Sequence, residues 1–418
     1  MTGAERRERE LARTDPDYRV YVPDAPEGRD AENQHFIVEP TPTGAFVAVW
    51  TQSSIENADD QRVVAARSAD GGETWSDPVE VAGRGPDDPP GTGLASWGFP
   101  VVADTGDGHR VYCFYNKNVG VDDAREDTTG ALRYRWSDDD GRTWSAEAHG
   151  LSIDSCAISH PDSEVPESWI VYQAPTRVEG AVLAGFTHWA SDTFDDAHIF
   201  ERQSEIRFLR FSALGGDPAD VEVTTWPDAD HGLQVPHPDR PGVSVAQEPS
   251  VRPLGDGRLI CVMRTLQGRV YFALSADGGR TWDTPRPLSY DPEEFRPVEN
   301  PIAPCPLYRL ADGRLLLVFY DNDGTGHGAA GPTHIRRNRT PAWYALGEVV
   351  DHPTHPVRFE GPWVLADNDC AVYGPNERTE VASYPSFFEH GGRAYFWYPD
   401  RKHFLLGTDL TEELDRRE

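Results

Sequence analysis

An eight-residue pattern, Ser-x-Asp-x-Gly-x-Thr-Trp, occurs three times in the 418-residue chain and strongly restricts the folds open to it. The copies are SADGGETW from Ser68 to Trp75, SDDDGRTW from Ser137 to Trp144 and SADGGRTW from Ser275 to Trp282. In each copy, Asp and Gly suit a tight turn with positive φ, Ser and Thr can bond nearby backbone, and Trp can pack under the turn. Each copy therefore predicts a β-hairpin turn, which by itself carries no chemistry.

Apolar strand-like runs around the octets repeat as a longer unit of four strands, which is the pattern of a propeller blade. Three blades carry an octet, and a degenerate third blade around AVLAGFTHWAS lacks one. A fifth blade follows from IAPCPLYRL, and a sixth begins at SYPSFFE with three strands, so we expect the segment 18–22 to supply its fourth. Helical periodicity is nearly absent apart from a short acidic tail. The sequence predicts an all-β fold, a six-bladed β-propeller with four-stranded antiparallel blades.

We expect one domain over residues 1–418. Residues 17–32 form its closing strand and lead-in, residues 33–408 its blades, and residues 409–418 a charged tail. Acidic residues outnumber basic ones by 70 to 39, which gives a formal charge of -31. Such a surface repels phosphate backbones and anionic lipid, so nucleic acid and membranes are excluded as partners. Scarce lysine and only two methionines fit a halophile's cytosol, and an acidic mesophile protein is the alternative.

Residues 1–16 lack the apolar core of a secretion signal, and no stretch approaches the length of a membrane span, so we expect a cytoplasmic protein. The five cysteines form no C-x-x-C pair. Cys113, Cys261 and Cys305 lie in apolar runs and are expected to be buried free thiols. No cofactor is expected, and the sequence does not indicate an oligomeric state.

In a propeller, the innermost strands converge on a central channel, so polar residues at their starts can form one site. These starts include Gln34-His35, Trp97, Gln247-Glu248 and Ser383-Tyr384. The segment QEPSV, followed by DGRL, VMR and the third octet, resembles the sialidase superfamily with its Asp-box (BNR) repeats. RNRTPAWYALG and ASYPSF are similar to two further segments of that family, and the resemblance spans about residues 34–408.

The resemblance implies a sialidase-like glycoside hydrolase that removes a terminal carboxylated sugar, of the sialic or uronic acid type. It implies that Tyr384 is the nucleophile with Glu248 as its base, and that Arg264 and Arg339 bind the substrate carboxylate. Arg337, beside Arg339, is a further candidate for binding the anion. The general acid is expected in the loop ENADDQ, from Asp59 or Asp60.

The first blade departs from the family, because Gln34-His35-Phe36 stands where sialidases have Arg-Ile-Pro. A titrating histidine cannot replace a permanent bidentate clamp. His35 with Tyr384 would instead suit a lyase that cleaves uronate linkages, such as rhamnosyl-glucuronate, by β-elimination. A propeller that only binds a glycan or a protein is the third hypothesis.

Further substrate contacts are expected from Gln34 and Trp97 at the inner-strand starts, and from Asn322 and His334 in the glycine-rich stretch DNDGTGHGAAGPTH. His327, His334 and the run 321–323 could bind a divalent ion. Their spacing matches no ligand signature, so an acidic loop is favoured and no metal is predicted.

Overall fold

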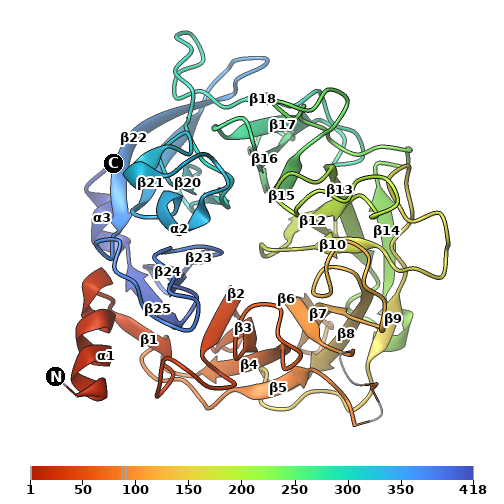
Figure 1. Ribbon diagram of the computed structural model, residues 1–418, viewed down its shortest axis with the longest axis vertical. Coiled ribbons are helices and arrows are strands. Elements are labelled where there is room, and N and C mark those ends of the chain that lie inside the picture. Colours follow the sequence, from red (N-terminus) through yellow and green to blue (C-terminus); the bar gives the residue numbers. More distant parts are fainter. Residues whose placement is uncertain (1, 87, 90–91, 418) are drawn as a thin grey trace.

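The computed structural model describes residues 2–86, 88–89 and 92–417, and it is a six-bladed β-propeller, as the sequence predicts. Six antiparallel sheets stand around a central axis (Figure 1). The innermost strands include β2 (Glu32–Pro40), β6 (Ala95–Asp104), β15 (Ala246–Pro253) and β23 (Ser386–His390). Continuous apolar runs explain these strands, and β3 (Phe46–Ser53) and β16 (Leu259–Thr265) are buried along their whole length, because neighbouring blades cover both faces of each sheet.

The first two blades have four strands each. Blade one consists of β2 (Glu32–Pro40), β3 (Phe46–Ser53), β4 (Arg62–Ser68) and β5 (Val79–Ala82), and blade two of β6 (Ala95–Asp104), β7 (His109–Lys117), β8 (Ala131–Ser137) and β9 (His149–Leu151).

The third blade has five strands, one more than the expected four, because both β10 and β11 pair with β12. It consists of β10 (Ser168–Ile170), β11 (Thr176–Val178), β12 (Ala181–Trp189), β13 (Ser204–Ser212) and β14 (Glu222–Trp226), with the 3₁₀ turn η2 (Pro218–Asp220) before β14.

Blades four, five and six again have four strands each. They consist of β15 (Ala246–Pro253), β16 (Leu259–Thr265), β17 (Tyr271–Ser275) and β18 (Arg286–Pro287); of β19 (Leu307–Arg309), β20 (Leu315–Phe319), β21 (Ala342–Val349) and β22 (Val357–Ala366); and of β23 (Ser386–His390), β24 (Arg393–Asp400), β25 (Phe404–Asp409) and β1 (Tyr18–Tyr21).

The amino-terminal strand β1 pairs antiparallel with β25, so the two ends of the chain meet in one blade. The structure also contains α1 (Gly3–Leu11), η1 (Ala12–Thr14), η3 (Gly326–Gly328), α2 (Ile335–Asn338) and α3 (Thr411–Asp415). Helix α1 was not anticipated. Its signal is a capping box in which Thr2 and Glu5 bond each other's backbone N–H groups, and sequence reasoning overlooked it.

The octet turns join the third and fourth strands of blades one, two and four. In the first, the Ser68 hydroxyl accepts the N–H of Gly72 at 2.9 Å, and the Asp70 carboxylate accepts the N–H of Thr74 at 3.0 Å. The tryptophans pack across blade boundaries, since the Trp282 ring stacks on Phe208 with centroids 4.6 Å apart. The repeat therefore locks each hairpin and also joins adjacent blades.

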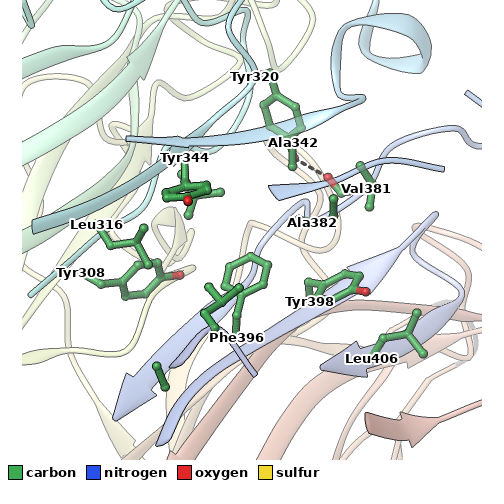
Figure 2. Packing of buried hydrophobic residues seen from close by; sticks show 14 of the residues in the cluster. Tyr308, Leu316, Tyr320, Ala342, Tyr344, Val381, Ala382, Phe396, Tyr398 and Leu406 are labelled. Carbon is green, nitrogen blue, oxygen red and sulfur yellow. Dashed lines mark hydrogen bonds between the residues drawn. The ribbon is translucent and has the colours of Figure 1, made fainter. Parts of the chain in front are cut away.

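Apolar clusters fill the space between blades, as Figure 2 shows where blade five meets blade six. There Tyr308, Leu316 and Tyr344 face Phe396 and Tyr398, all of them buried. The Tyr320 hydroxyl donates to the carbonyl of Val381 at 2.9 Å. This packing fixes the relative positions of the blades, and so of the loops at their ends.

Candidate active site

A cavity of about 460 Å³ collects side chains from all six blades and their loops. Its volume falls in the range that encloses a small ligand. The lining residues are Glu56, Asn57, Trp97, Ala124, Arg125, Ile170, Trp189, Asp196, Ala197, His198, Ile199, Phe200, Arg202, Glu248, Arg264, Ile335, Arg339, Tyr384 and Lys402.

The Tyr384 hydroxyl donates a hydrogen bond of 2.8 Å to Glu248 Oε1, although 136 residues separate the two in sequence. Both side chains are buried. Burial and the Glu248 carboxylate raise the pKa of the Tyr384 phenol, while Arg264 and Arg339 partly oppose that rise. The phenol is therefore neutral near pH 7, and a carboxylate is in place to accept its proton.

Two buried arginines lie beside this pair. Arg264 Nη1 is 2.7 Å from Glu248 Oε1, and the same guanidinium donates to Gln247 Oε1 at 2.7 and 3.2 Å. Arg339 Nη1 pairs with Glu380 at 3.1 Å, and its Nη2 donates to the carbonyl of Ile302 at 2.7 Å. Arg339 Nε and Glu248 Oε2 make no hydrogen bond within the described part of the chain. Because both residues line the cavity, these two atoms are available to a bound ligand or water.

A repeated backbone irregularity aims several of these side chains. His35, Trp97, Glu248 and Tyr384 have φ values of 56°, 54°, 49° and 68°, in the left-handed region that non-glycine residues rarely adopt. In blades one, two and four, the ladder between the first two strands shifts register at this position, which is a β-bulge. Thr187 Oγ1 accepts the N–H of Glu248 at 2.7 Å and so fixes the bulge from the preceding blade. The strain thus lies at the site, as expected for a functional constraint.

Glu56 is a cavity carboxylate that sequence reasoning missed. It pairs with Arg378, and its Oε1 lies 3.2 Å from Lys402 Nζ. Burial alone would raise the pKa of this carboxyl, but Lys402, Arg378 and Arg125 hold it well below its usual range. Glu56 is therefore ionised in the free protein. It lies in the ENADDQ loop, whose composition gave a signal for a carboxylate but not for the right one.

The two aspartates expected as general acid do not reach the cavity. Asp60 Oδ1 accepts the backbone N–H and hydroxyl of Ser54 at 3.1 and 3.0 Å, and Asp59 is exposed. Both line a separate surface depression with Arg29 and Arg62. Asp60 therefore stabilises its own loop, whereas Glu56 of the same loop lines the cavity.

His35 lies behind Trp97, outside the set of cavity-lining residues. The two rings stack with centroids 3.3 Å apart and planes 15° apart, and Trp97 itself lines the cavity. His35 Nδ1 is 3.0 Å from Thr51 Oγ1. Burial, together with Lys402, lowers the pKa of His35 well below its usual value, so the ring is neutral. No permanent charge replaces the blade-one arginine at this position.

Four other candidates lie away from the cavity lining. Gln34 is buried in β2, and its amide makes no hydrogen bond to the described residues. Asn322 donates to the carbonyls of Tyr320 and Asn338 and so fixes a loop. His334 Nδ1 accepts the N–H of Ala330 at 3.2 Å. Arg337 is exposed on α2, whereas Ile335 at the start of this helix and Arg339 just after its end line the cavity.

No group of three or more His, Cys, Asp or Glu side chains in the described ranges is arranged to hold a metal ion. The side chain of His327 lies outside the described residues. Asp323 Oδ1 accepts the hydroxyl of Thr325 at 2.6 Å within its own turn. None of the helices that the structure describes has the length and apolar composition to cross a membrane.

Lys402, Arg125 and Arg202 also line the cavity without having been anticipated. Lys402 Nζ lies 5.4 Å from the centre of the Tyr384 ring. It directly follows the strand-end sequence Tyr398-Pro399-Asp400-Arg401, so its position gave a weak signal. Arg125 and Arg202 lie in irregular loops, where the strand pattern carries no information about direction.

Solved structures of similar fold include several sialidases. A Hadza microbial sialidase, Hz136, has a TM-score of 0.59 and 15% identity, over 92% of this chain and 67% of that one. A Trypanosoma rangeli sialidase in complex with sialic acid has a TM-score of 0.57 and 13% identity, over 96% of this chain and 58% of that one. A protein of unknown function from Dyadobacter fermentans has a TM-score of 0.61 and 15% identity, over 94% of this chain and 96% of that one. These identities show a shared fold and leave the reaction open.

A comparison with curated protein sequences finds no significant match. The family model described as BNR repeat-like domain matches residues 44–395, which is most of the chain. This match agrees with the octet turns, with the six blades and with the sialidase-like fold. The chain therefore belongs to the BNR repeat-like domain family of the sialidase-like superfamily.

Proposed function

We propose that this protein is a retaining glycoside hydrolase of the sialidase type, which removes a terminal sugar that carries a carboxylate. The observation that carries the proposal is the 2.8 Å hydrogen bond from Tyr384 to Glu248 in a cavity that Arg264 and Arg339 also line. A neutral nucleophile with a carboxylate base and two buried guanidinium groups fits an anionic sugar. Similar folds include a sialidase that binds sialic acid, which supports the same substrate class.

In the first step, the Tyr384 oxygen attacks the anomeric carbon while Glu248 takes the phenolic proton. A carboxylate nucleophile would be repelled by a substrate carboxylate attached near the reacting carbon, whereas a neutral phenol is not. The product of this step is a glycosyl–tyrosine intermediate, and the bond to the leaving oxygen breaks.

Arg264 and Arg339 hold the substrate carboxylate through charge-assisted hydrogen bonds. Because the blade-one position carries the neutral His35, Lys402 supplies the further positive charge beside Tyr384 in our proposal. The unpartnered Arg339 Nε is one donor available to the ligand.

Glu56 is our candidate for proton transfer at the leaving oxygen, in place of the two aspartates. In its protonated form it gives a proton to the departing sugar, and as a carboxylate it then takes a proton from the water that releases the intermediate. Its ion pairs with Arg378 and Lys402 favour the carboxylate form, so this assignment predicts faster cleavage at acidic pH.

Hydrolysis has more support than β-elimination. The lyase hypothesis needs His35 to move a proton at the sugar, but His35 does not line the cavity, and its ring stacks on Trp97, which does. A cavity of about 460 Å³ also fits one or two sugar rings better than a long polymer, which favours exo action.

The test is incubation in high salt with sialoside, glucuronide and rhamnosyl-glucuronate oligosaccharides, with released sugar and ultraviolet absorbance read together. Glu248→Gln is the matched variant, because it keeps the shape and removes the base. Sugar release without the absorbance of an unsaturated uronate, lost in the variant, is the expected result. An increase in the absorbance of an unsaturated uronate would establish the lyase instead, and no activity on any of the substrates would favour a propeller that only binds a glycan or a protein.

A further inference from the structure

A second group of reactive side chains lies in blade three, apart from the cavity. Cys156 is in the connection between β9 and β10, partly exposed and flanked by the exposed Ser155 and Ala157. Cys113, Cys261 and Cys305 are buried, as expected from their apolar runs. Cys156 and Cys370 are therefore the two thiols within reach of solvent in the part of the chain described here.

Cys156 is the first member of a chain of hydrogen bonds. Its Sγ is 3.4 Å from His188 Nδ1, and His188 Nε2 is 2.7 Å from Glu167 Oε2. The Ser159 hydroxyl donates to the same Glu167 oxygen at 2.6 Å and accepts the N–H of Cys156 at 2.8 Å. A thiol beside an imidazole that a carboxylate orients is the arrangement by which proteins activate cysteine nucleophiles.

The surroundings of His188 favour a proton shared with the sulfur. Its side chain is fully buried, which alone would lower its pKa, but the bonds to Cys156 and Glu167 raise the pKa to about 9. Burial likewise opposes ionisation of Glu167, and the bond to His188 still lowers the pKa of that carboxyl. The imidazole can therefore hold the proton that leaves the thiol.

One neighbour acts in the opposite direction. Glu205 Oε1, from β13, is 3.4 Å from Cys156 Sγ, and a negative charge there disfavours a thiolate. The same carboxylate is held by His231 at 3.2 Å and by Gln234 at 3.0 Å, and the buried Arg207 lies two residues along β13. The two carboxylates of this cluster thus have opposite effects on the sulfur.

We propose that Cys156 is a nucleophilic thiol that reacts with small hydroperoxides, with His188 as its proton acceptor and Glu167 as the group that positions the imidazole. The sulfur attacks one peroxide oxygen, so an S–O bond forms and the O–O bond breaks. The departing oxygen takes the proton from His188. Sulfur is oxidised by two electrons to a sulfenic acid, and the peroxide is reduced to an alcohol or water.

Access and donors favour this class of electrophile over larger ones. Cys156 is only partly exposed, which suits a molecule of a few atoms. His188 Nδ1, 3.4 Å from the sulfur, provides the proton for the leaving oxygen, while the Ser159 hydroxyl donates to Glu167 at 2.6 Å and so helps to hold that carboxylate. The site does not depend on the proposed glycosidase activity.

The test measures the rate at which hydrogen peroxide makes Cys156 reactive toward dimedone, by mass spectrometry of peptides, with Cys370 as the control in the same sample. Near pH 7 we expect Cys156 to react about tenfold faster than Cys370, because His188 Nδ1 lies 3.4 Å from its sulfur and can take the thiol proton. Glu167→Gln should slow Cys156 about tenfold, whereas Glu205→Gln should speed it, and neither should change Cys370.

Equal rates at Cys156 and Cys370, or an unchanged rate in Glu167→Gln, would overturn the proposal. If a variant fails to fold, the wild-type pH profile decides. An unassisted thiol gains about tenfold in rate per pH unit below its pKa of about 8.5, so a Cys156 profile as steep as that of Cys370 would also refute the role of His188.

Discussion

Replacement of Tyr384 by phenylalanine separates the chemical role of the hydroxyl from its structural role. The substitution removes one oxygen and its 2.8 Å hydrogen bond to Glu248, and it leaves Arg264 as the ion-pair partner of that carboxylate. A hydrogen bond to a charged group contributes about 1.5–3 kcal/mol, so the free energy of unfolding should fall by that amount. A domain with a stability of about 5–15 kcal/mol remains folded after such a loss.

The effect on activity should be much larger. Loss of the attacking oxygen should lower kcat/KM at least about a thousandfold, which corresponds to about 4 kcal/mol in the barrier. Tyr320→Phe is the matched control, because its buried hydroxyl donates at 2.9 Å to the Val381 carbonyl and lies outside the cavity lining. It should lose about 1 kcal/mol of stability and keep its activity.

Urea denaturation gives the two stability changes, and sugar release per folded molecule gives the two rates. If Tyr384→Phe keeps its activity within tenfold of the wild type, Tyr384 is not the nucleophile. If Tyr320→Phe loses as much activity as Tyr384→Phe, the loss reflects packing rather than chemistry.

Three further substitutions and one change of solvent test other parts of the structure. Glu56→Gln should abolish cleavage of substrates with poor leaving groups and spare aryl glycosides, whose leaving groups need no acid. Wild-type cleavage of substrates with poor leaving groups should rise as pH falls, since the pKa of Glu56 is held low and only its protonated form is an acid. Burial outweighs the ion pair of Glu32 with Arg378 at 2.9 Å and raises the pKa of Glu32 to about 6. The wild type should therefore lose stability relative to Glu32→Gln as pH rises from about 4.5 through about 6, and urea titrations of both proteins across this range check the direction. Trp282→Ala removes the ring stacked 4.6 Å from Phe208 and should cost about 2 kcal/mol, whereas an unchanged thermal midpoint would show that the octet tryptophan does not join the blades. With a net charge of -31, the protein should melt at a higher temperature in about 1 M KCl than in sucrose of equal osmolarity, and equal midpoints would contradict salt adaptation.

The octets and the apolar runs determined the architecture, because both are local. A turn that needs Asp, Gly and Trp at fixed offsets, and strands that alternate with period two, can be read from neighbouring residues alone. The six blades and the family follow from this level. Helix α1 shows the limit of local sequence patterns, since its capping box is a short signal. Most of the stability of such a short helix comes from contacts with the rest of the protein, such as the 2.9 Å ion pair between the buried Glu10 and Arg401.

The tertiary structure decided which polar groups share the cavity. Sequence patterns pointed to Glu248 and Tyr384, and the folded chain, with positive φ at both residues, places the Tyr384 hydroxyl 2.8 Å from Glu248 Oε1. The choice of Glu56 over Asp59 and Asp60 depended on the path of one loop and on the pairs that Glu56 makes with Arg378 and Lys402. Side chains along a strand alternate between its two faces with a period of two residues, so their directions can be predicted from the sequence. The directions of loop side chains depend on packing and charge contributed by distant parts of the chain, so only the tertiary structure determines them.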